Sequence, residues 1–477
     1  MSVAQLYGLD ELASATGGAV RGTPGAVTGI SIDTRTLAAG DAFFAITGDS
    51  SDGHAYVTRA LENGAALAVV ARDKADAFAP DAPLLLVEDV LEAMRGTAAA
   101  ARARTQAAIA AVTGSVGKTT TKEALRLALS ADGQTHASAA SYNNHWGVPL
   151  SLARLPRTAR YGVFEIGMNH PGEITPLVRL VRPQVAIVTT VEAVHIAQFA
   201  NIEEIADAKA EIFDGLEHGG TAVLNLDNPL FAHLKAAAEA KGVGRIVSFG
   251  ANPAADVRLV DVSLKASCST LVADVLGTQV TLKVGMPGRH IVQNVLAVLA
   301  AVKLLGADLA LAALALSALK PPPGRGVPVE LAVSGGTATL LDESYNANPA
   351  SMRAAIDVLS RTPVGPRGRR IAVLGDMLEL GSDGPAHHRE LAAPLRAAGI
   401  DLVFAAGPLM HELWVALPSN MRGGYAPTSQ ALTGLLSSAI RSGDTLMVKG
   451  SNGSRMGPLV KALADRFRTP DEALLEG

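Results

Sequence analysis

The chain has 477 residues, 48% of them hydrophobic, and its 41 Lys and Arg nearly balance its 45 Asp and Glu, which leaves a net charge of −4. This length predicts a large protein of about two to four domains. The near-neutral charge argues against a dedicated nucleic-acid binder. The most apolar stretch, residues 291–319, is interrupted by polar side chains, so it predicts packed helices and no membrane span.

The cysteine content and the first residues indicate the compartment. The single cysteine, Cys268, excludes an internal disulfide framework. The opening residues, MSVAQLYGLDELASATGG, lack the basic start, apolar core and cleavage site of a secretory signal. We therefore expect a cytoplasmic protein.

Three blocks follow one another along the chain, and each alternates short apolar runs with helical patterns. This alternation is typical of α/β domains with parallel sheets. We place the blocks at residues 1–85, 86–324 and 325–477, because Pro, Gly, Ala and Arg crowd together near these boundaries. The proline run at residues 321–323 predicts a hinge between the second and third blocks.

Strands are predicted at both ends of the chain. In the first block, residues 42–46 and 66–70 predict strands on either side of a helix near residues 54–63. The third block contains four apolar runs that each end in polar or glycine residues, as expected of strands in an open α/β sheet. These runs lie in the segments TATLLDESYNANPASM, RRIAVLGDMLELG, DLVFAAG and DTLMVKGSNGSRM.

The most informative stretch opens the middle block, with the sequence AAIAAVTGSVGKTTT at residues 107–121. Residues 108–112 predict a buried strand. Gly114 and Gly117 then allow backbone N–H groups to turn inward, Lys118 adds a positive charge, and Thr119 offers a hydroxyl to magnesium. The strict phosphate-loop pattern has another glycine where this chain has Val112, so this is a shortened variant. We favour nucleotide binding over an ordinary strand–turn–helix.

Two polar side chains follow predicted strands of the same block. Glu165 comes directly after the strand at residues 161–164, and His195 comes just after the strand at 185–191. Ligands of open α/β sheets bind at the carboxyl ends of strands, and carboxylate oxygens suit magnesium. Each residue alone is more simply explained as a satisfied surface group. Their shared location beside the phosphate loop makes a metal site an equal alternative.

Lys209 lies on the apolar face of a helix predicted over residues 202–216. A charged ammonium buried there would be costly. One interpretation is that its side chain reaches solvent or pairs with Asp207, Glu211 or Asp214. The other is a buried lysine with a lowered pKa, ready for covalent chemistry. The pattern alone leaves both open. The apolar face comprises Ile202, Ile205, Ile212, Phe213 and Leu216.

Nine segments together make the chain resemble the Mur ligases of peptidoglycan synthesis. They are GSVGKTTTKE, YNNHWGVP, EIGMNHPGEI, AKAEIF, GRHIVQN, PPPGRG, DESYNANPASM, GDMLELG and VKGSNGSRM. The resemblance covers essentially the whole chain, in order. It implies three domains: a UDP-substrate-binding N-terminal domain, a central P-loop ATPase-like domain with a parallel sheet, and a Rossmann-like C-terminal domain.

The resemblance also implies an activity. DESYNANPASM and GDMLELG are the features most particular to the member that adds D-alanyl-D-alanine to a UDP-N-acetylmuramoyl-tripeptide. This member is an ATP-dependent amide ligase that proceeds through an acyl phosphate and a tetrahedral intermediate. Its expected partners are these two substrates, and we expect a monomer. Two alternatives stay open: another amide ligase of the superfamily, acting on a nucleotide peptide or a folate, and a nucleotide-gated regulatory protein.

When the roles known in the family are carried over by motif, the resemblance implies which residues bind ATP and two magnesium ions. The metal ligands would be Thr119, Glu165, His195 and a carbamylated Lys209, whose neutral amine burial favours. The catalytic residues would be Lys118, Glu165, His195 and Lys209. The ATP-binding residues would be Gly114, Ser115, Val116, Gly117, Lys118, Thr119, Thr120, Asn294, Arg325 and Asp342.

The resemblance further implies two groups of substrate-binding residues and one departure. Many Mur ligases have asparagine directly after the histidine of the GRH segment, whereas this chain has Ile291, so Asn294 would carry more of the adenine contact. Asn348 before Pro349 is equally well explained as a helix start. The groups are Thr34, Arg35, Asp49, Ser50, Ser51, Asn143 and Asn144 on the nucleotide-peptide side, and Tyr345, Asn346, Asn348, Asp376 and Lys449 on the dipeptide side.

Overall fold

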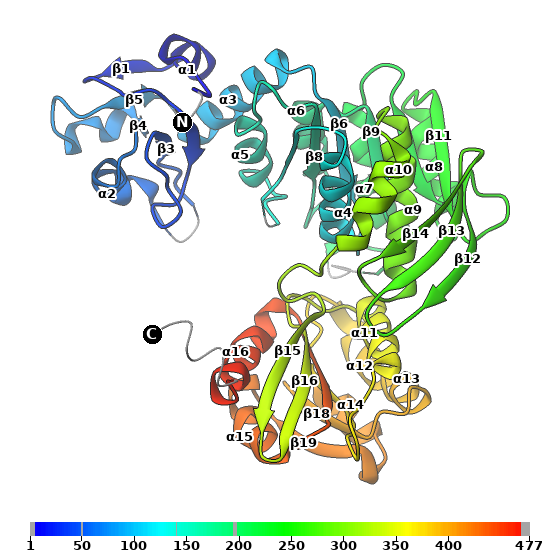
Figure 1. The fold of residues 1–477 in the computed structure, drawn as a ribbon. Coiled ribbons are helices and arrows are strands. Elements are labelled where there is room, and N and C mark those ends of the chain that lie inside the picture. The colour runs from blue at the N-terminus through cyan, green and yellow to red at the C-terminus, as the bar shows by residue number, and fades with distance from the viewer. Residues whose placement is uncertain (1–4, 49–50, 140, 194–197, 469–477) are drawn as a thin grey trace.

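The computed structural model describes residues 5–48, 51–139, 141–193 and 198–468. They form an α/β fold of three consecutive units, each built on its own mixed sheet. Figure 1 shows the first unit at one end of the molecule, the middle unit beside it, and the third unit below the middle one. No helix in these described ranges is long and apolar enough to cross a bilayer.

The first unit holds a five-stranded sheet in the order β1-β5-β4-β3-β2, in which β1 is antiparallel and the other pairs are parallel. The strands predicted at 42–46 and 66–70 are confirmed as β3 and β4. The helix predicted near 54–63 is present as a 3₁₀ turn followed by α2. The elements are α1 (Leu9–Thr16), β1 (Ala19–Arg21), β2 (Gly29–Ser31), β3 (Asp41–Phe44), η1 (Gly53–Tyr56), α2 (Val57–Glu62), β4 (Leu67–Ala71), η2 (Arg72–Ala77) and β5 (Leu84–Val87).

Helix α3 (Val90–Arg104) connects the first unit to the middle unit and packs against helices of both. Strand β5 ends at Val87, so the first sheet continues slightly beyond residue 85. Side chains of one unit bond to the backbone of the other. Tyr7 Oη donates to Ala153 O at 2.6 Å, and Arg154 Nε donates to Ile30 O at 2.7 Å.

The middle unit holds a nine-stranded sheet in the order β14-β13-β12-β11-β10-β9-β6-β8-β7. Strands β6 to β12 pair in parallel, and β12 to β14 form an antiparallel extension. The elements are β6 (Ala108–Thr113), α4 (Lys118–Ser130), β7 (Thr135–Ala137), α5 (Gly147–Ala153), β8 (Tyr161–Glu165), α6 (Ile174–Val181), β9 (Val185–Val188), α7 (Ile202–Ala210), η4 (Glu211–Gly215), β10 (Thr221–Asn225), α8 (Phe231–Ala240), β11 (Arg245–Gly250), β12 (Val257–Leu264), β13 (Ser269–Val275), β14 (Thr278–Val284), α9 (Arg289–Leu304), α10 (Leu309–Ala315) and η5 (Leu316–Ala318).

Strand β6 is the topological switch point of this sheet. From β6 the chain crosses to β7 on one side, returns through β8, and then continues to β9 and β10 on the other side. In open α/β sheets ligands bind at such a point, beyond the carboxyl ends of the strands. The predicted phosphate loop follows β6 directly, so the topology puts it where a ligand is expected.

The third unit holds a six-stranded sheet in the order β15-β16-β20-β17-β18-β19, parallel except for the edge strand β15. All four predicted strands are present, as β16, β17, β18 and β20. The elements are β15 (Val327–Val333), β16 (Gly336–Glu343), α11 (Pro349–Arg361), β17 (Arg370–Gly375), η6 (Gly381–Asp383), α12 (Gly384–Glu390), α13 (Ala392–Ala397), β18 (Leu402–Ala406), α14 (Met410–Ala416), η7 (Ser419–Met421), β19 (Arg422–Ala426), α15 (Ser429–Ala439), β20 (Thr445–Lys449), η8 (Asn452–Ser454) and α16 (Met456–Arg466).

Two middle-unit predictions differ in extent from the structure. The strand predicted at 185–191 ends at Val188, because the chain turns there to meet the phosphate loop. The helix predicted over 202–216 divides into α7 and the 3₁₀ helix η4, which tightens the last turn. The apolar stretch 291–319 forms the packed helices α9 and α10, as predicted.

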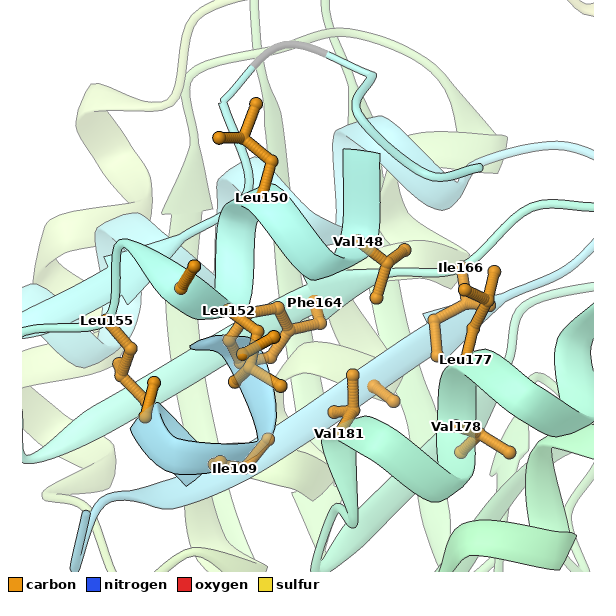
Figure 2. Close-up of a cluster of buried hydrophobic side chains, with 14 of the residues drawn as sticks. Ile109, Val148, Leu150, Leu152, Leu155, Phe164, Ile166, Leu177, Val178 and Val181 are labelled. Carbon is orange, nitrogen blue, oxygen red and sulfur yellow. The ribbon is translucent and has the colours of Figure 1, made fainter. Parts of the chain in front are cut away.

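The core under the site is formed by α5 and α6 against β6 and β8. Figure 2 shows Leu152 of α5 next to Phe164 of β8, with Val181 of α6 and Ile109 of β6 in the same cluster. All four side chains are fully buried. Close packing on this face of the sheet holds the strand ends, and therefore the loops that follow them, in fixed positions.

We expect Leu152→Ala to lower the free energy of unfolding by about 2–5 kcal/mol, since it removes buried methyl groups and leaves a cavity. Leu314 is a matched control, because it lies on α10 with 71% of its surface exposed. Leu314→Ala should change the free energy by less than about 0.5 kcal/mol. Urea unfolding followed by circular dichroism measures both. Equal effects of the two variants would contradict this assignment of the core.

Candidate active site

The phosphate loop has a backbone that only glycine adopts readily. Gly114 has φ = 145° and Gly117 has φ = 90°, both in the region that favours glycine. The surroundings are also too close for a side chain. A Cβ at Gly114 would lie 2.0 Å from Thr189 Oγ1, and one at Gly117 would lie 2.8 Å from Asn294 Oδ1. The loop is therefore packed tightly against the end of β9 and the start of α9.

Hydrogen bonds fix this loop to the chain that follows β9. Ser115 N donates to Thr190 O at 2.8 Å, and Ser115 Oγ donates to Glu192 O at 3.0 Å. Thr189 Oγ1 donates to Val116 O at 2.6 Å. Helix α4 begins at the end of this loop. Its N terminus therefore presents backbone N–H groups and the positive end of the helix dipole to the loop. This arrangement suits a bound phosphate.

Lys118 folds back over the loop from the first turn of α4. Its Nζ donates to Gly114 O at 2.7 Å and to Ser115 O at 3.4 Å. Burial lowers the pKa of Lys118, the Glu165 carboxylate opposes this shift, and the Arg325 guanidinium adds to it. A cation held by carbonyl oxygens beside a second cation is an attractive partner for a polyanion.

Glu165 ends β8 with its side chain 1% exposed. Asn143 Nδ2 donates to its Oε1 at 2.7 Å, whereas its Oε2 is buried and has no hydrogen-bond partner among the described residues. Thr119 Oγ1 lies nearby on the loop side, 3.5 Å from Ser141 Oγ. Burying an unpaired carboxylate oxygen is costly, so this atom calls for a cation. The donor set fits magnesium, which prefers hard oxygen ligands.

Within the described ranges, no group of three or more His, Cys, Asp or Glu side chains could hold a metal ion by itself. This is compatible with magnesium, which is usually held by one or two protein carboxylates together with substrate phosphates and water. His195, predicted as a further ligand, lies outside the described residues.

Lys209 is buried on α7, with only 3% of its surface exposed. Its three predicted ion-pair partners are engaged elsewhere. Asp207 bonds to His233, Asp214 to Thr175 and Lys241, and Glu211 accepts from the backbone at the start of α6. No carboxylate among the described residues lies within ion-pair distance of Lys209. Burial, with a contribution from the charge of Lys118, lowers its pKa well below the ordinary value. The structure thus favours the buried lysine with a lowered pKa over the ion-paired one.

A cavity of about 490 Å³ opens between the phosphate loop and the third unit. It joins most of the predicted ATP and dipeptide residues, although Lys209 is not part of its lining. Its walls come from the loop, from the ends of β8, β9 and β10, from α9, and from α11 and β20. The predicted residues that line it are Ser115, Val116, Gly117, Lys118, Thr119, Thr120, Asn143, Glu165, Asn294, Arg325, Tyr345, Asn346, Asn348 and Lys449.

The third unit contributes two cations to this cavity. The Arg325 guanidinium lies 4.2 Å from the ring centroid of Tyr345, a cation–π contact that orients it. Lys449, at the end of β20, is buried, and its Nζ contacts Glu343 Oε2 at 3.3 Å and Asn346 O at 3.0 Å. Both cations are therefore held in position before any ligand arrives.

Four predicted binding residues have clear structural roles. Asn348 caps α11, with Oδ1 accepting from Ser351 N at 2.8 Å, although it also lines the cavity. Asp376 accepts from Met410 N at 2.8 Å and so holds the start of α14. Asn144 accepts from Gly147 N, and Asp342 accepts from Ser344. Of these four, only Asn348 lines the main cavity. Asp342 lines an adjacent hollow that shares Gly324 and Tyr345 with it.

The residues predicted to bind the UDP moiety are in the first unit, away from this cavity. Arg35 is exposed, and its Nη2 pairs with Asp33 Oδ2 at 2.6 Å. Thr34 O accepts from Asn63, and Ser51 O accepts from Gly48 N. Asp49 and Ser50 lie outside the described residues.

Several cavity-lining residues were not singled out from the sequence. Glu192 follows β9, and burial raises its pKa while Arg353 opposes that shift. His290, on α9, has a pKa lowered by burial. Asn225, at the end of β10, could have been found by the strand-end rule that identified Glu165. The others that line the cavity near them include Ser141, Thr189, Thr190, Met286, Gln293 and Glu343.

Family models match all three units of the chain. The model of the Mur ligase family, catalytic domain, matches residues 26–102. The Mur ligase middle domain matches residues 112–302, and the Mur ligase, glutamate ligase domain, matches residues 330–452. The three sheets thus correspond in order to the three domain types of this family.

Individual relatives agree along nearly the full length. The UDP-N-acetylmuramoyl-tripeptide–D-alanyl-D-alanine ligase of Escherichia coli is 35% identical over 96% of this chain and 98% of its own. That of Bacillus subtilis is 31% identical over 92% and 93%. Among solved structures, MurF from Acinetobacter baumannii has a TM-score of 0.82 at 27% identity, over 97% of this chain and 100% of its own. MurF from Thermotoga maritima in complex with ADP has a TM-score of 0.74 at 26% identity, over 92% and 99%. The chain belongs to the Mur ligase family.

Proposed function

We propose that this chain joins D-alanyl-D-alanine to UDP-N-acetylmuramoyl-tripeptide, using ATP, in the synthesis of peptidoglycan precursors. The observation that carries this proposal is the full-length match to the Escherichia coli ligase of that specificity, 35% identical across all three units. The cavity supports it, because it joins a phosphate loop to two fixed cations of the third unit.

The reaction couples phosphoryl transfer to amide formation. The tripeptide carboxylate attacks the γ-phosphate of ATP, which gives an acyl phosphate and ADP. The dipeptide amine then attacks the activated carbonyl, and phosphate leaves the tetrahedral intermediate. Positioning and charge neutralisation dominate such chemistry. We assign both tasks to the loop N–H groups of residues 115–120 and to the Lys118 side chain, which lie together at the cavity wall.

Magnesium would be held by Thr119 and by the buried Oε2 of Glu165. When bound, it neutralises phosphate charge and aligns the phosphate oxygens. Asn143 holds the other oxygen of Glu165 and so directs the carboxylate. We infer that His195 contributes to a second metal ion, as its motif implies.

Lys209 is proposed to carry a carbamate formed with carbon dioxide. Only a neutral amine can form this group, and burial lowers the pKa of Lys209 in the required direction. The carbamate would convert a buried cation into an anionic oxygen ligand for magnesium. The lack of a carboxylate partner among the described residues supports this role, because the ammonium form has nothing to neutralise it.

The three units would divide the substrates among them. We propose that the first unit binds the UDP moiety through Thr34, Arg35 and its neighbours, and that the middle unit binds ATP. The third unit would bind the dipeptide through Tyr345, Asn346, Asn348 and Lys449. We assign no substrate contact to Asp376 and Asn144, whose side chains bond within the protein. We place the domain boundaries after β5 and at the prolines before Arg325.

We also infer that the protein works as a monomer in the cytoplasm.

Lys118→Ala should reduce kcat/KM for ligation by at least about 10²–10³-fold, because it removes a charge aimed at the transferring phosphate. Phosphate release, together with mass spectrometry of the pentapeptide product, measures the effect. Lys265→Ala is the matched control, since Lys265 is exposed on the β12–β13 hairpin. A Lys118→Ala variant as active as the control would contradict the proposed site.

The carbamate predicts a bicarbonate requirement with a defined pH dependence. Since burial depresses the pKa of Lys209, the neutral amine, and with it the carbamate, is lost as pH falls through that depressed pKa. With ¹³C-bicarbonate, we expect a carbamate signal by NMR that weakens as pH falls and is absent from Lys209→Arg.

Lys122→Arg is the matched control for the carbamate. Lys122 is also fully buried, but its Nζ is held by Ser138 O at 2.8 Å and by Glu123 at 2.6 Å, so it should remain unmodified. The signal should persist in this variant. A Lys209→Arg protein that keeps both the signal and full ligase activity would rule out the assignment.

A further inference from the structure

One wall of the cavity continues directly from the phosphate loop toward the end of β10. Asn294 of α9 is so close to Gly117 that a Cβ there would lie 2.8 Å from Asn294 Oδ1. Asn225, at the end of β10, donates Nδ2 to Thr189 O at 3.2 Å, and Thr189 Oγ1 donates to Val116 O of the loop. A nucleotide held by its phosphates must extend its ribose and base along a wall that is continuous with the loop.

Apolar side chains from two units line this cavity. Met286 and Ile291 line it from the middle unit, and Ala350 and Ala354 line it from α11 of the third unit. Such surfaces suit the faces of a flat ring. The side chain of Ile291 has no polar atom, so another residue must supply hydrogen bonds to the edge of a base.

Gln293 lines the same wall, and its amide is held in one orientation. Its Nε2 donates to Asp227 Oδ2 at 2.7 Å and to Asn225 Oδ1 at 3.3 Å. Asp227 is fixed in turn, since its carboxylate accepts from Ala251 N at 2.6 Å and from Asn252 N at 2.9 Å. A carboxylate only accepts hydrogen bonds, so the Gln293 atom that faces it must be the NH₂ group.

This orientation leaves the Gln293 carbonyl oxygen as a free acceptor. No described residue donates a hydrogen bond to Gln293 Oε1. Adenine carries an amino group, a donor, at position 6, whereas guanine carries a carbonyl oxygen, an acceptor, at the same position. An acceptor fixed at this wall would bind the first base and repel the second.

We propose that Gln293 determines the purine specificity of this ligase, with its Oε1 accepting a hydrogen bond from the 6-amino group of adenine. Asp227 is the positioning residue that keeps this oxygen directed at the base. The relevance of this inference to catalysis rests on the proposed function. The inference itself can be tested by nucleotide binding alone.

The test is titration calorimetry of the full chain with ADP and with GDP, in the presence of magnesium. Gln293→Leu should raise the dissociation constant of ADP about 3–10-fold, as expected for the loss of one hydrogen bond. Binding of GDP should stay equal or improve, so the preference for ADP falls by at least that factor. Gln279→Leu is the matched control, because Gln279 is exposed on β14. It should leave both constants unchanged.

The variant Asp227→Asn tests whether Asp227 positions the Gln293 amide or has a merely structural role. It should lower the preference for ADP in the parent protein, because an asparagine can donate to Gln293 Oε1 and allow its amide to turn over. In the Gln293→Leu background the same change should have no further effect on the preference, since the two residues act as one unit.

An ADP preference within twofold of the parent in folded Gln293→Leu would overturn the proposal. Should that variant fail to fold by circular dichroism, Gln293→Met is measured in its place against the same criterion. If the parent protein does not ligate the two substrates, but its preference for ADP over GDP depends on Gln293, only the proposed function is contradicted. If the parent protein ligates the two substrates, but Gln293→Leu keeps the same preference for ADP over GDP, only this inference is overturned.

Discussion

The packing of the phosphate loop against its neighbours is the constraint on which the rest of the site depends. Gly117 touches the Asn294 amide, and Gly114 touches the Thr189 hydroxyl, so a side chain at either position would push α9 or the end of β9 away. The sheet puts this loop at its switch point, between the ends of β8 and β9. Glu165 and Thr189 therefore reach the loop simply because their strands are its neighbours.

Charge explains why two units must share one cavity. The middle unit supplies Lys118, and the third unit supplies Arg325 and Lys449, all lining the same space as Glu165 and Glu343. The proximity of Arg325 contributes to the lowered pKa of Lys118, which is the expected cost of gathering like charges. A triphosphate or an acyl phosphate relieves that cost. The same charges attract the anionic intermediates of ligation.

The sequence allowed prediction of features that depend on neighbours in the chain. The phosphate loop, strands β3 and β4, and the α9–α10 helices follow from local patterns. Contacts between distant segments were not predictable in the same way. Asp376 lies just after the end of β17, much as Glu165 lies at the end of β8, yet Asp376 holds the start of α14 instead of lining the cavity.

Lys209 and Gln293 illustrate the same limit. The pattern placed Lys209 on an apolar face, but only the fold shows that its candidate partners are engaged elsewhere. The orientation of the Gln293 amide is set by Asp227, which lies 66 residues away in the chain. No local pattern carries such information.

The measurement that tests the central claim most directly is phosphate release with ATP, magnesium and UDP-N-acetylmuramoyl-tripeptide, in the presence of different amines. D-alanyl-D-alanine, D-alanine, a single L-amino acid and no amine would be compared in parallel, with mass spectrometry of the products. We predict phosphate release and a UDP-N-acetylmuramoyl-pentapeptide only with the dipeptide. Release at the same rate with any amine, or with none, would contradict the account.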